Sequence, residues 1–411
     1  MNKNKHIPQG YKESPLGIIP KEWEVKKLGD CTRLLTNGFV GVATPHYTDD
    51  PDGITYIQGF NVTEGGYNFT GIKKVTKEFH KKNSKSSLQD GDLLTIQTGD
   101  IGLTTIVPKE LEGSNCHALI ISRFKEGILP CFMLYYYNST IGRNRFHIIE
   151  TGSTMKHINT GDLYKFYVPV PPIDEQKIII AIASLWDTSI KKQSELIEKL
   201  KLRKRALMQQ LLTGKKRLPG FSEEWKEVKL GDIFDERNET KRNDLPLLSI
   251  TGDKGVIYQS ESYKRDISND DKSKYKRICP NDIGYNTMRM WQGRSALSNI
   301  EGIVSPAYTI VTPHKNVDVR FMAMLIQQPR IVYDFWTHSQ GLVSDTLNCK
   351  YPDFCQVKVR IPSKEEQTAI ADLLYEFDKE IDLANEKLAS LQSQKRGLMQ
   401  QLLTGRKRII G

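Results

Sequence analysis

The chain has 411 residues, 38% hydrophobic and 26% charged, which is enough apolar material for two to four packed domains. Its 59 lysines and arginines exceed its 49 acidic residues, and the net charge of +10 favours an anionic partner such as nucleic acid. No apolar run approaches the ~18 residues of a membrane span, and no secretion signal follows Met1. The six cysteines include no C-x-x-C pair. We therefore expect a cytosolic (cytoplasmic) protein with reduced thiols and no membrane partner.

An internal repeat organises the chain. The N-terminal segment 1–30 ends in Trp23–Asp30, W-E-V-K-K-L-G-D, which returns 202 residues later as Trp225–Asp232, W-K-E-V-K-L-G-D. Lys204–Gly214 returns 191 residues later as Lys395–Gly405, with ten identities in eleven positions. Since internal repeats dictate architecture, the sequence predicts one framework, used twice, that carries two inserts of different sequence.

The first insert, residues 31–172, is rich in β-type runs separated by glycines. We expect strands within Ile54–Phe60, Asp92–Thr98 and Cys116–Phe124. A helix over Leu129–Asn138, a polar loop and a final strand should complete the insert. The insert is therefore a mixed α/β domain.

A long helix, at about residues 174–212, should dominate the central region 173–232. Its apolar residues recur at alternating spacings of four and three, the 3.5-residue period of a coiled coil. Pro171-Pro172 precedes it, and Gly214 stands where a left-handed glycine ends a helix. About 39 residues at 1.5 Å each give roughly 60 Å, which is long for a helix packed on one small core.

The second insert, residues 233–362, follows the plan of the first. Strands are expected within Leu245–Thr251, Asp282–Met290 and Ile303–Thr312, then a helix over Val319–Gln327, a polar loop and a final strand. The C-terminal segment 363–411 repeats the long helix, with Ser363 and Glu366 spaced as a capping box.

The two long helices should pair with each other in an antiparallel coiled coil. The repeat is circularly arranged, because the partner of the segment that follows Gly214 stands at the N-terminus, so the two chain ends should lie close together. A parallel pair would break this closure. The predicted seam comprises Trp186, Ile190, Ile197, Leu200, Phe377, Ile381, Leu388 and Leu391. Lys204 and Lys395 also fall on the seam, where each either fixes the register or extends to water. The expected fold is α+β, with a pseudo-twofold axis.

No catalytic pattern is convincing. The sequence has no G-x-x-x-x-G-K-[ST] phosphate loop, no G-x-G-x-x-G after a strand and no H-E-x-x-H, and its eight histidines are scattered. Pro352-Asp353 with Lys358 faintly matches a nuclease core, but its spacing is too tight to place acids and a lysine around a metal ion. We expect neither a catalytic nor a metal-binding residue, and hence no enzyme.

The whole frame resembles the specificity subunit of type I restriction–modification systems. The motifs that carry the resemblance are W-x-x-x-x-L-G-D, then the insert, then P-P-I-D-E-Q at Pro171–Gln176, a long helix and L-M-Q-Q-L-L-T-G at Leu207–Gly214, all repeated. The resemblance covers essentially all 411 residues. It implies that each insert is a target recognition domain reading one half of a bipartite, asymmetric DNA site, and that the helices act as a spacer.

The same resemblance implies the partners. These are double-stranded DNA, two methyltransferase (modification) subunits docked on the helices, and restriction subunits that join through the assembled complex. It also implies that this chain binds no cofactor, and that S-adenosylmethionine, ATP and Mg belong to the partner subunits. Adenine is the base that such complexes methylate.

The candidate base-reading side chains are polar residues of the two inserts. Arginine pairs bidentately with guanine, and asparagine or glutamine with adenine. The candidates in the first insert are Lys73, Lys74, Arg143, Arg145, Thr154, Lys156 and His157, and those in the second are Asn286, Arg289, Gln292, Arg294, Ser344 and Lys350. For each of them a solvated surface charge or a phosphate contact is the simpler interpretation.

Two other classes of function fit parts of the sequence. A coiled-coil scaffold with two protein-binding heads explains the repeat but not the basic charge, and its binding would survive high salt. A nuclease acting alone explains the charge but lacks the acids, and it would cleave DNA by itself with a metal ion.

Overall fold

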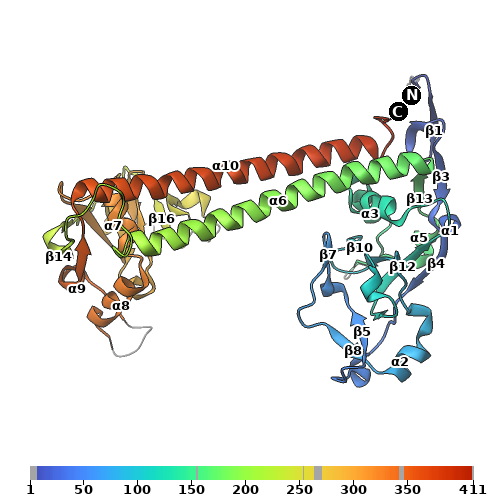
Figure 1. Ribbon diagram of the computed structural model, residues 1–411, viewed down its shortest axis with the longest axis horizontal. Coiled ribbons are helices and arrows are strands. Elements are labelled where there is room, and N and C mark those ends of the chain that lie inside the picture. Colours follow the sequence, from blue (N-terminus) through green and yellow to red (C-terminus); the bar gives the residue numbers. More distant parts are fainter. Residues whose placement is uncertain (1–6, 154–155, 253, 263–270, 342–346, 410–411) are drawn as a thin grey trace. The chain divides into compact units, whose positions relative to one another are not determined.

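The computed structural model divides into two compact units, drawn in Figure 1. It describes residues 7–153, 156–252, 254–262, 271–341 and 347–409. The first unit comprises Met1–Ser194 with Glu386–Gly411, and the second comprises Glu195–Asn385. Both divisions fall inside the long helices α6 (Ile173–Leu211) and α10 (Lys364–Leu402), each of 39 residues. Each unit therefore combines one insert with one part of each long helix, whereas the sequence segments end at the helix starts.

A four-stranded antiparallel sheet forms the centre of the first unit. Its strand order is β10 (Thr104–Ile106), β9 (Leu93–Ile96), β12 (Leu119–Phe124) and β4 (Thr32–Asn37). All four residues of β9, Leu-Leu-Thr-Ile, are buried, so this strand shows no alternation of apolar and polar residues. Helix α3 (Pro130–Asn138) packs into the same core as Ile179 and Ala183 of α6, so the domain is joined to the long helix by apolar contact.

The other elements of the first unit are small. A three-stranded sheet consists of β11 (Asn115–Cys116), β5 (Ile54–Ile57) and β8 (Lys73–Val75). Three two-stranded pairs are β1 (Tyr11–Ser14) with β2 (Gly17–Pro20), β3 (Glu24–Lys27) with β13 (Tyr167–Val170), and β6 (Val62–Thr63) with β7 (Gly66–Tyr67). The short helices are α1 (Leu28–Cys31), α2 (Lys77–Lys82), α4 (Thr140–Ile148) and α5 (Thr160–Tyr164).

The second unit has a central sheet of the same order. Strands β15 (Phe234–Glu236), β22 (Tyr308–Pro313), β19 (Ile283–Asn286) and β20 (Ser295–Leu297) correspond to β4, β12, β9 and β10. Two-stranded pairs are β14 (Lys226–Lys229) with β23 (Lys358–Ile361), β16 (Leu248–Thr251) with β17 (Gly255–Tyr258), and β18 (Lys276–Ile278) with β21 (Gly302–Val304). Helices α7 (Val319–Leu325), α8 (Pro329–His338) and α9 (Tyr351–Gln356) follow. The two inserts thus share one fold.

The polar loop expected before each final strand was wrong. In the first unit this stretch contains α4 and α5, and in the second it contains α8 and α9. Ser139 starts α4, because its hydroxyl accepts a hydrogen bond from the Gly142 amide at 3.1 Å. Pro329 stands in the first turn of α8, where a missing amide proton costs nothing.

The long helices pack against each other in antiparallel directions, as predicted. In the first unit the start of α6, at Ile179 and Ala183, shares a core with Met399 and Leu402 near the end of α10. In the second unit the end of α6 at Leu211 shares a core with the start of α10, including Ile370 and Leu374. The pairing therefore has the two-fold character that the repeat suggested.

The two seam lysines form reciprocal ion pairs instead of reaching free into water. Lys395 pairs with Asp187 in the first unit, and Lys204 pairs with Asp378 in the second. Both lysines and both aspartates are related by the repeat offset of 191 residues. A parallel alignment of equivalent positions would set lysine against lysine, so these pairs favour the antiparallel arrangement.

Burial along the predicted seam is uneven. Ile197, Leu200 and Phe377 are buried. The remaining seam residues are half-buried, namely Trp186, Ile190, Ile381, Leu388 and Leu391. The best-buried seam residues belong to the second unit.

Each long helix begins at a buried Glu-Gln pair that ties it to its domain. Gln176 accepts a hydrogen bond from the Leu129 amide before α3 at 2.9 Å, and Gln367 accepts one from the Asp318 amide before α7 at 2.9 Å. The capping box predicted at Ser363 and Glu366 forms only in part. Ser363 accepts the Glu366 amide at 3.4 Å, but the Glu366 carboxylate binds Arg217 at 2.5 and 2.6 Å, because a guanidinium is the stronger donor.

The two ends of the described chain meet in the first unit. The Tyr11 hydroxyl donates to the Gly405 carbonyl at 3.0 Å, and Arg408 binds Glu175 at 3.0 Å and Glu22 at 2.6 Å. Gly405 has φ of +68°, the left-handed conformation expected of a glycine beyond a helix end. The predicted proximity of the chain ends is confirmed.

Candidate functional site

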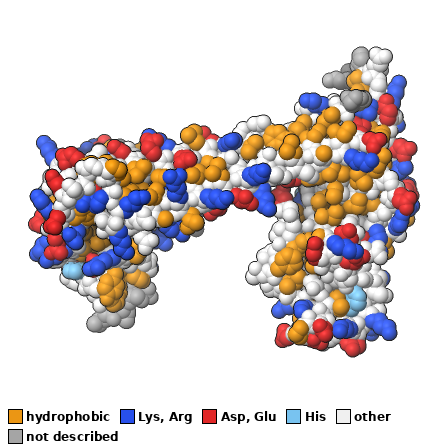
Figure 2. Space-filling model, in the orientation of Figure 1, with side chains coloured by type: hydrophobic (Ala, Val, Ile, Leu, Met, Phe, Trp, Pro, Cys, Tyr) orange, Lys and Arg blue, Asp and Glu red, His pale blue; other side chains and the backbone are white. Residues whose placement is uncertain are grey.

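Charge alone does not locate a binding face. In Figure 2 basic and acidic side chains are intermixed over the visible face of each unit. The site must therefore be found from the partners of individual side chains and from the hollows that they line.

In the second unit, the loop between β19 and β20 is fixed by core packing and by hydrogen bonds within the loop. Met290 is fully buried in the core, and the Asn286 side-chain oxygen accepts the Met288 amide at 3.0 Å. The Trp291 indole donates to the Met288 carbonyl at 3.0 Å. Gly293, with φ of +72°, closes the turn. Side chains on this loop therefore start from fixed positions.

This loop lines a hollow of about 590 Å³. All four residues predicted in the segment from the end of β19 to the start of β20 lie on its wall: Asn286, Arg289, Gln292 and Arg294. The opposite wall is the β16–β17 hairpin, with Thr251 and Gly252. Sequence reasoning missed this hairpin, because its contact with the loop is made across the fold and leaves no local signal.

Arg289 and Arg294 are the two arginines that line the hollow. Among the residues that the structure describes, no hydrogen bond or ion pair engages the guanidinium group of Arg289 or Arg294. Both residues are exposed. An arginine left free in a concave, preformed site is available to an anionic or hydrogen-bond-accepting ligand.

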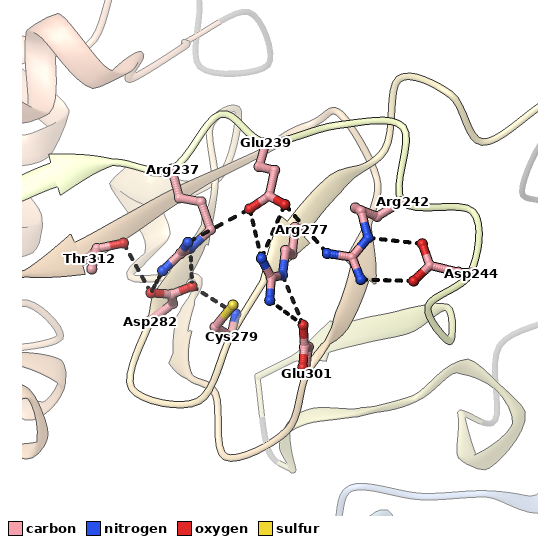
Figure 3. Close-up of polar contacts among 9 residues, drawn as sticks. All are labelled: Arg237, Glu239, Arg242, Asp244, Arg277, Cys279, Asp282, Glu301 and Thr312. Carbon is pink, nitrogen blue, oxygen red and sulfur yellow. Dashed lines mark hydrogen bonds and ion pairs between the residues drawn. The ribbon is translucent and has the colours of Figure 1, made fainter.

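Three other arginines of the same domain are bound to acids, as Figure 3 shows. Arg237 forks onto Asp282 at 2.7 and 3.2 Å, and Arg242 forks onto Asp244 at 2.9 and 2.8 Å. Arg277 bridges Glu239 at 2.9 Å and Glu301 at 2.5 Å. These arginines stabilise the domain, and their positive charge is matched by acids.

Tyr308 adds a neutral polar group to the hollow. Burial raises the pKa of its phenol, so the hydroxyl keeps its proton at neutral pH. The hydroxyl donates to the Ile250 carbonyl at 3.4 Å. Tyr308 thus ties β22 to the hairpin wall.

The late loop of the second domain adjoins this site. Ser344 lies outside the described residues. Lys350 is exposed at the start of α9, where its amide donates to Asp353 at 3.1 Å. The Cys349 amide donates to the Thr287 carbonyl at 2.8 Å, which joins the late loop to the β19–β20 loop.

The first unit has a corresponding loop, residues 97–103 between β9 and β10. The Ile158 amide donates to the Gln97 carbonyl at 3.0 Å, and Ile158 precedes Cys349 by the repeat offset of 191 residues. Thr98 forms a β-bridge with His157. The structure therefore brings the predicted His157 to this loop. Thr154 lies outside the described residues.

Two predicted cations of the first unit lie in this region and bind acids. Arg143 of α4 is ion-paired with Asp100 of the loop. Lys156 is ion-paired with Glu150 at 3.3 Å, and the side-chain hydrogen bond from His147 lowers the pKa of Glu150. Asp100 was missed in the sequence, although Gly99 and Gly102 flank it much as glycine flanks the second loop. The first site is thus closer to charge balance than the second.

Three other predicted base-reading residues of the first domain make contacts away from the β9–β10 loop. Arg145 packs 4.9 Å from the ring of Phe166 and donates to the Tyr167 carbonyl at 3.1 Å, which indicates a packing role. Lys73 and Lys74 stand on β8 in the separate three-stranded sheet. Lys74 donates to the Pro51 carbonyl at 2.7 Å. The structure does not join these three to the β9–β10 loop.

Within the described ranges, no three His, Cys, Asp or Glu side chains gather closely enough to hold a metal ion. None of the described helices is long and apolar enough to cross a membrane.

A family model describes the chain twice. The model of the type I restriction modification DNA specificity domain matches residues 20–202 and 222–393. The chain is also 24% identical over 437 residues to the putative type I restriction enzyme MjaX specificity subunit of Methanocaldococcus jannaschii, covering 98% of this chain and 97% of the relative. It is 26% identical over 164 residues to the EcoBI specificity subunit of Escherichia coli, covering 40% and 34%.

Solved structures share the fold. The HsdS subunit from Thermoanaerobacter tengcongensis aligns with a TM-score of 0.54 at 16% identity, covering 96% of this chain and 100% of that one. A chain from work on complex assembly and conformational transition of the type I R-M system aligns with a TM-score of 0.61 at 15% identity, covering 95% and 99%.

Proposed function

Because the chain belongs to the family of type I restriction–modification DNA specificity subunits, we propose that the β9–β10 and β19–β20 loops carry the base-reading side chains of its two target recognition domains. Recognition of DNA is the task of such a subunit, and catalysis is not. Each domain would read one half of a bipartite site. Since the two inserts differ in sequence, the two half-sites should differ as well.

The free arginines of the second hollow carry this proposal. Arg289 and Arg294 stand beside Gln292 on a firmly held loop, while Arg237, Arg242 and Arg277 of the same domain are matched by acids. Side chains that read bases need a fixed backbone and unused hydrogen-bond donors. The loop supplies both.

The first domain supports the same function with different chemistry. There Asp100 of the β9–β10 loop is ion-paired with Arg143 of α4, and His157 forms a β-bridge with Thr98 of the same loop. A carboxylate can accept from the amino group of cytosine, and an arginine can donate to guanine. Lys156 and Lys350 are better suited to phosphate contacts, because a lysine acts as a point charge.

As a specificity subunit, the chain acts together with other subunits and DNA. We infer that two methyltransferase subunits dock on the long helices and that restriction subunits join through that complex. S-adenosylmethionine, ATP and Mg would be bound by those partners. A cytoplasmic location follows if the complex acts on cellular DNA. Half-site centres about one helical turn, or ~34 Å, apart would suit two readers on one face of the duplex.

The coiled-coil scaffold with two protein-binding heads is not favoured. It shares the repeat and the helix pair, but it gives no role to unpaired arginines in a hollow. The other alternative is a nuclease acting alone, which would differ from a specificity subunit by cleaving duplex DNA by itself in the presence of a metal ion.

Salt dependence of duplex binding tests the proposal. The chain is purified with its methyltransferase partner and titrated with a mixed duplex pool at several salt concentrations. The logarithm of the binding constant should fall linearly with the logarithm of salt, by about 0.9 per phosphate neutralised. Binding that ignores salt, or no binding at low salt, would contradict a DNA-reading function.

A further inference from the structure

We propose that the second target recognition domain recognises a guanine through Arg294, and that Gly252 positions Arg294 for this contact. The inference rests on the proposed function and adds the base class that the site accepts. It concerns two residues on facing walls of the hollow, one of them outside the set that the sequence suggested.

The backbone of Arg294 is fixed. Its carbonyl accepts the Asn286 amide at 3.0 Å, which extends the pairing of β19 with β20 by one step. Its own amide donates to the Arg289 carbonyl at 3.3 Å, which closes the loop. Arg294 therefore leaves the end of a sheet strand, the kind of position from which a side chain is aimed most reproducibly.

The guanidinium of Arg294 lies against the backbone of the facing hairpin. A Cβ atom built on Gly252 would stand 2.1 Å from Nη1 of Arg294, far inside van der Waals contact. Only glycine leaves this space open. Gly252 thus sets where the planar group rests, and no hydrogen bond from the described residues holds the guanidinium there.

The chemistry of the hollow favours guanine. Guanine presents two acceptors in the major groove, N7 and O6, at the spacing of the two outer donors of an arginine. Arg294 and Arg289 have no described carboxylate bound to them, and Glu261 is the acid among the described lining residues. Asn286 uses its side-chain oxygen on the Met288 amide, so it organises the loop and leaves base contact to its neighbours.

The first domain lacks this arrangement. There the corresponding loop carries Asp100, and this carboxylate already binds Arg143. Among the described residues, a free arginine fork is therefore found in the second hollow, and the guanine that Arg294 reads is expected in the half-site of the second domain.

Selection from random duplex DNA tests the inference. The full chain in complex with its methyltransferase partner is selected as wild type, Arg294→Ala and Arg294→Lys. The wild type should enrich a guanine at one position of one half-site. Both variants should lose that preference by roughly 5- to 150-fold, while the other half-site stays unchanged. Lysine keeps the charge but not the fork, so it separates base reading from phosphate attraction.

Gly252→Ala tests the positioning role. The added methyl group should displace the guanidinium and weaken the same guanine preference, while the salt dependence of binding stays that of the wild type. The double variant Gly252→Ala with Arg294→Ala should be no worse than Arg294→Ala alone. Arg330→Ala is the matched control, because it removes one exposed arginine of this domain outside the hollow and should leave the motif intact.

The outcomes are distinct. Two results would overturn the inference. One is a wild-type motif with no guanine whose enrichment Arg294→Ala abolishes. The other is an Arg294→Ala motif unchanged in sequence but bound more weakly throughout, which would make Arg294 a phosphate contact. A wild-type complex that enriches no sequence at all would overturn the proposed function itself. Thermal melting of each variant confirms that the domain stays folded.

Discussion

The two recognition domains share a buried aspartate–arginine pair, but the arginine comes from a different strand region in each domain. Each carries a buried aspartate just before a central strand, Asp92 before β9 and Asp282 before β19. Each aspartate accepts a backbone amide three residues earlier, at 2.8 and 2.7 Å. Each also binds an arginine through two hydrogen bonds, but Arg123 comes from β12, whereas Arg237 follows β15.

The different origins of the two arginines show which features the fold requires. The sheet needs a carboxylate at one corner and a guanidinium beside it, and more than one strand is close enough to provide the guanidinium. A buried charge requires a partner, but no particular position for it. Two inserts can therefore keep the same sheet while their sequences diverge, which explains why the inserts match so weakly while the frame matches so well.

Removing either aspartate should give the largest effect. Asp92→Ala and Asp282→Ala each leave a mostly buried arginine without its partner, so each should lower the free energy of unfolding by about 3–5 kcal/mol. Guanidinium-induced unfolding measures this. Asp244→Ala is the control, because its ion pair with Arg242 is exposed and should matter far less. A large loss of unfolding free energy in only one of these two variants would show that the two aspartates do not play equivalent roles.

Replacing the two tryptophans of the repeat, Trp23 and Trp225, should lower the stability of the protein by unequal amounts. The Trp23 indole donates to the buried Glu175 at 2.9 Å, whereas the Trp225 indole nitrogen is buried without a partner among the described residues. Trp23→Phe should therefore cost about 1.5–3 kcal/mol more than Trp225→Phe, because only the first loses a hydrogen bond to a charged group. Equal costs in thermal unfolding would show that the hydrogen bond contributes nothing.

Arg289 of the β19–β20 loop and Arg143 of α4 should differ in their effect on DNA binding. Arg289→Ala should weaken binding to the preferred site by about 1–3 kcal/mol if Arg289 reads a base, because the side chain is free. Arg143→Ala should cost less, since Arg143 is already bound to Asp100. Fluorescence anisotropy with the selected duplex compares them. An unchanged site preference in Arg289→Ala would refute its reading role.

The reciprocal ion pairs of the helices should give the smallest effect. A double-mutant cycle on Lys204 and Asp378 should yield a coupling of about 0.2–1 kcal/mol, because both side chains are partly exposed. The Lys395 and Asp187 pair should give the same value, since the repeat relates the two pairs. Clearly unequal couplings would mean that the pseudo-twofold relation does not extend to energetics.

The framework was predictable because its signals are local and repeated. The 3.5-residue period gave both long helices to within a residue or two, and the circular order of the repeat led to the contact between Tyr11 and Gly405. Helix α8 was missed because proline is usually a helix breaker, whereas Pro329 stands in the first turn, where its missing amide proton costs nothing.

The sites were only half predictable. Glycine-flanked Arg289, Gln292 and Arg294 stood out in one short segment, and the fold brings them to one hollow. The facing Gly252 and the Asp100 loop were missed, because pairing across the sheet is set by long-range contacts. Lys73 and Lys74 lie on β8 in another sheet, which no local sequence signal indicates.

The central claim is that two unlike domains read two unlike half-sites. Sequencing the duplexes that the wild-type complex retains from a random pool tests it most directly. The account predicts two different short motifs at a fixed distance around an unread gap. A palindrome, or one contiguous motif, would contradict it.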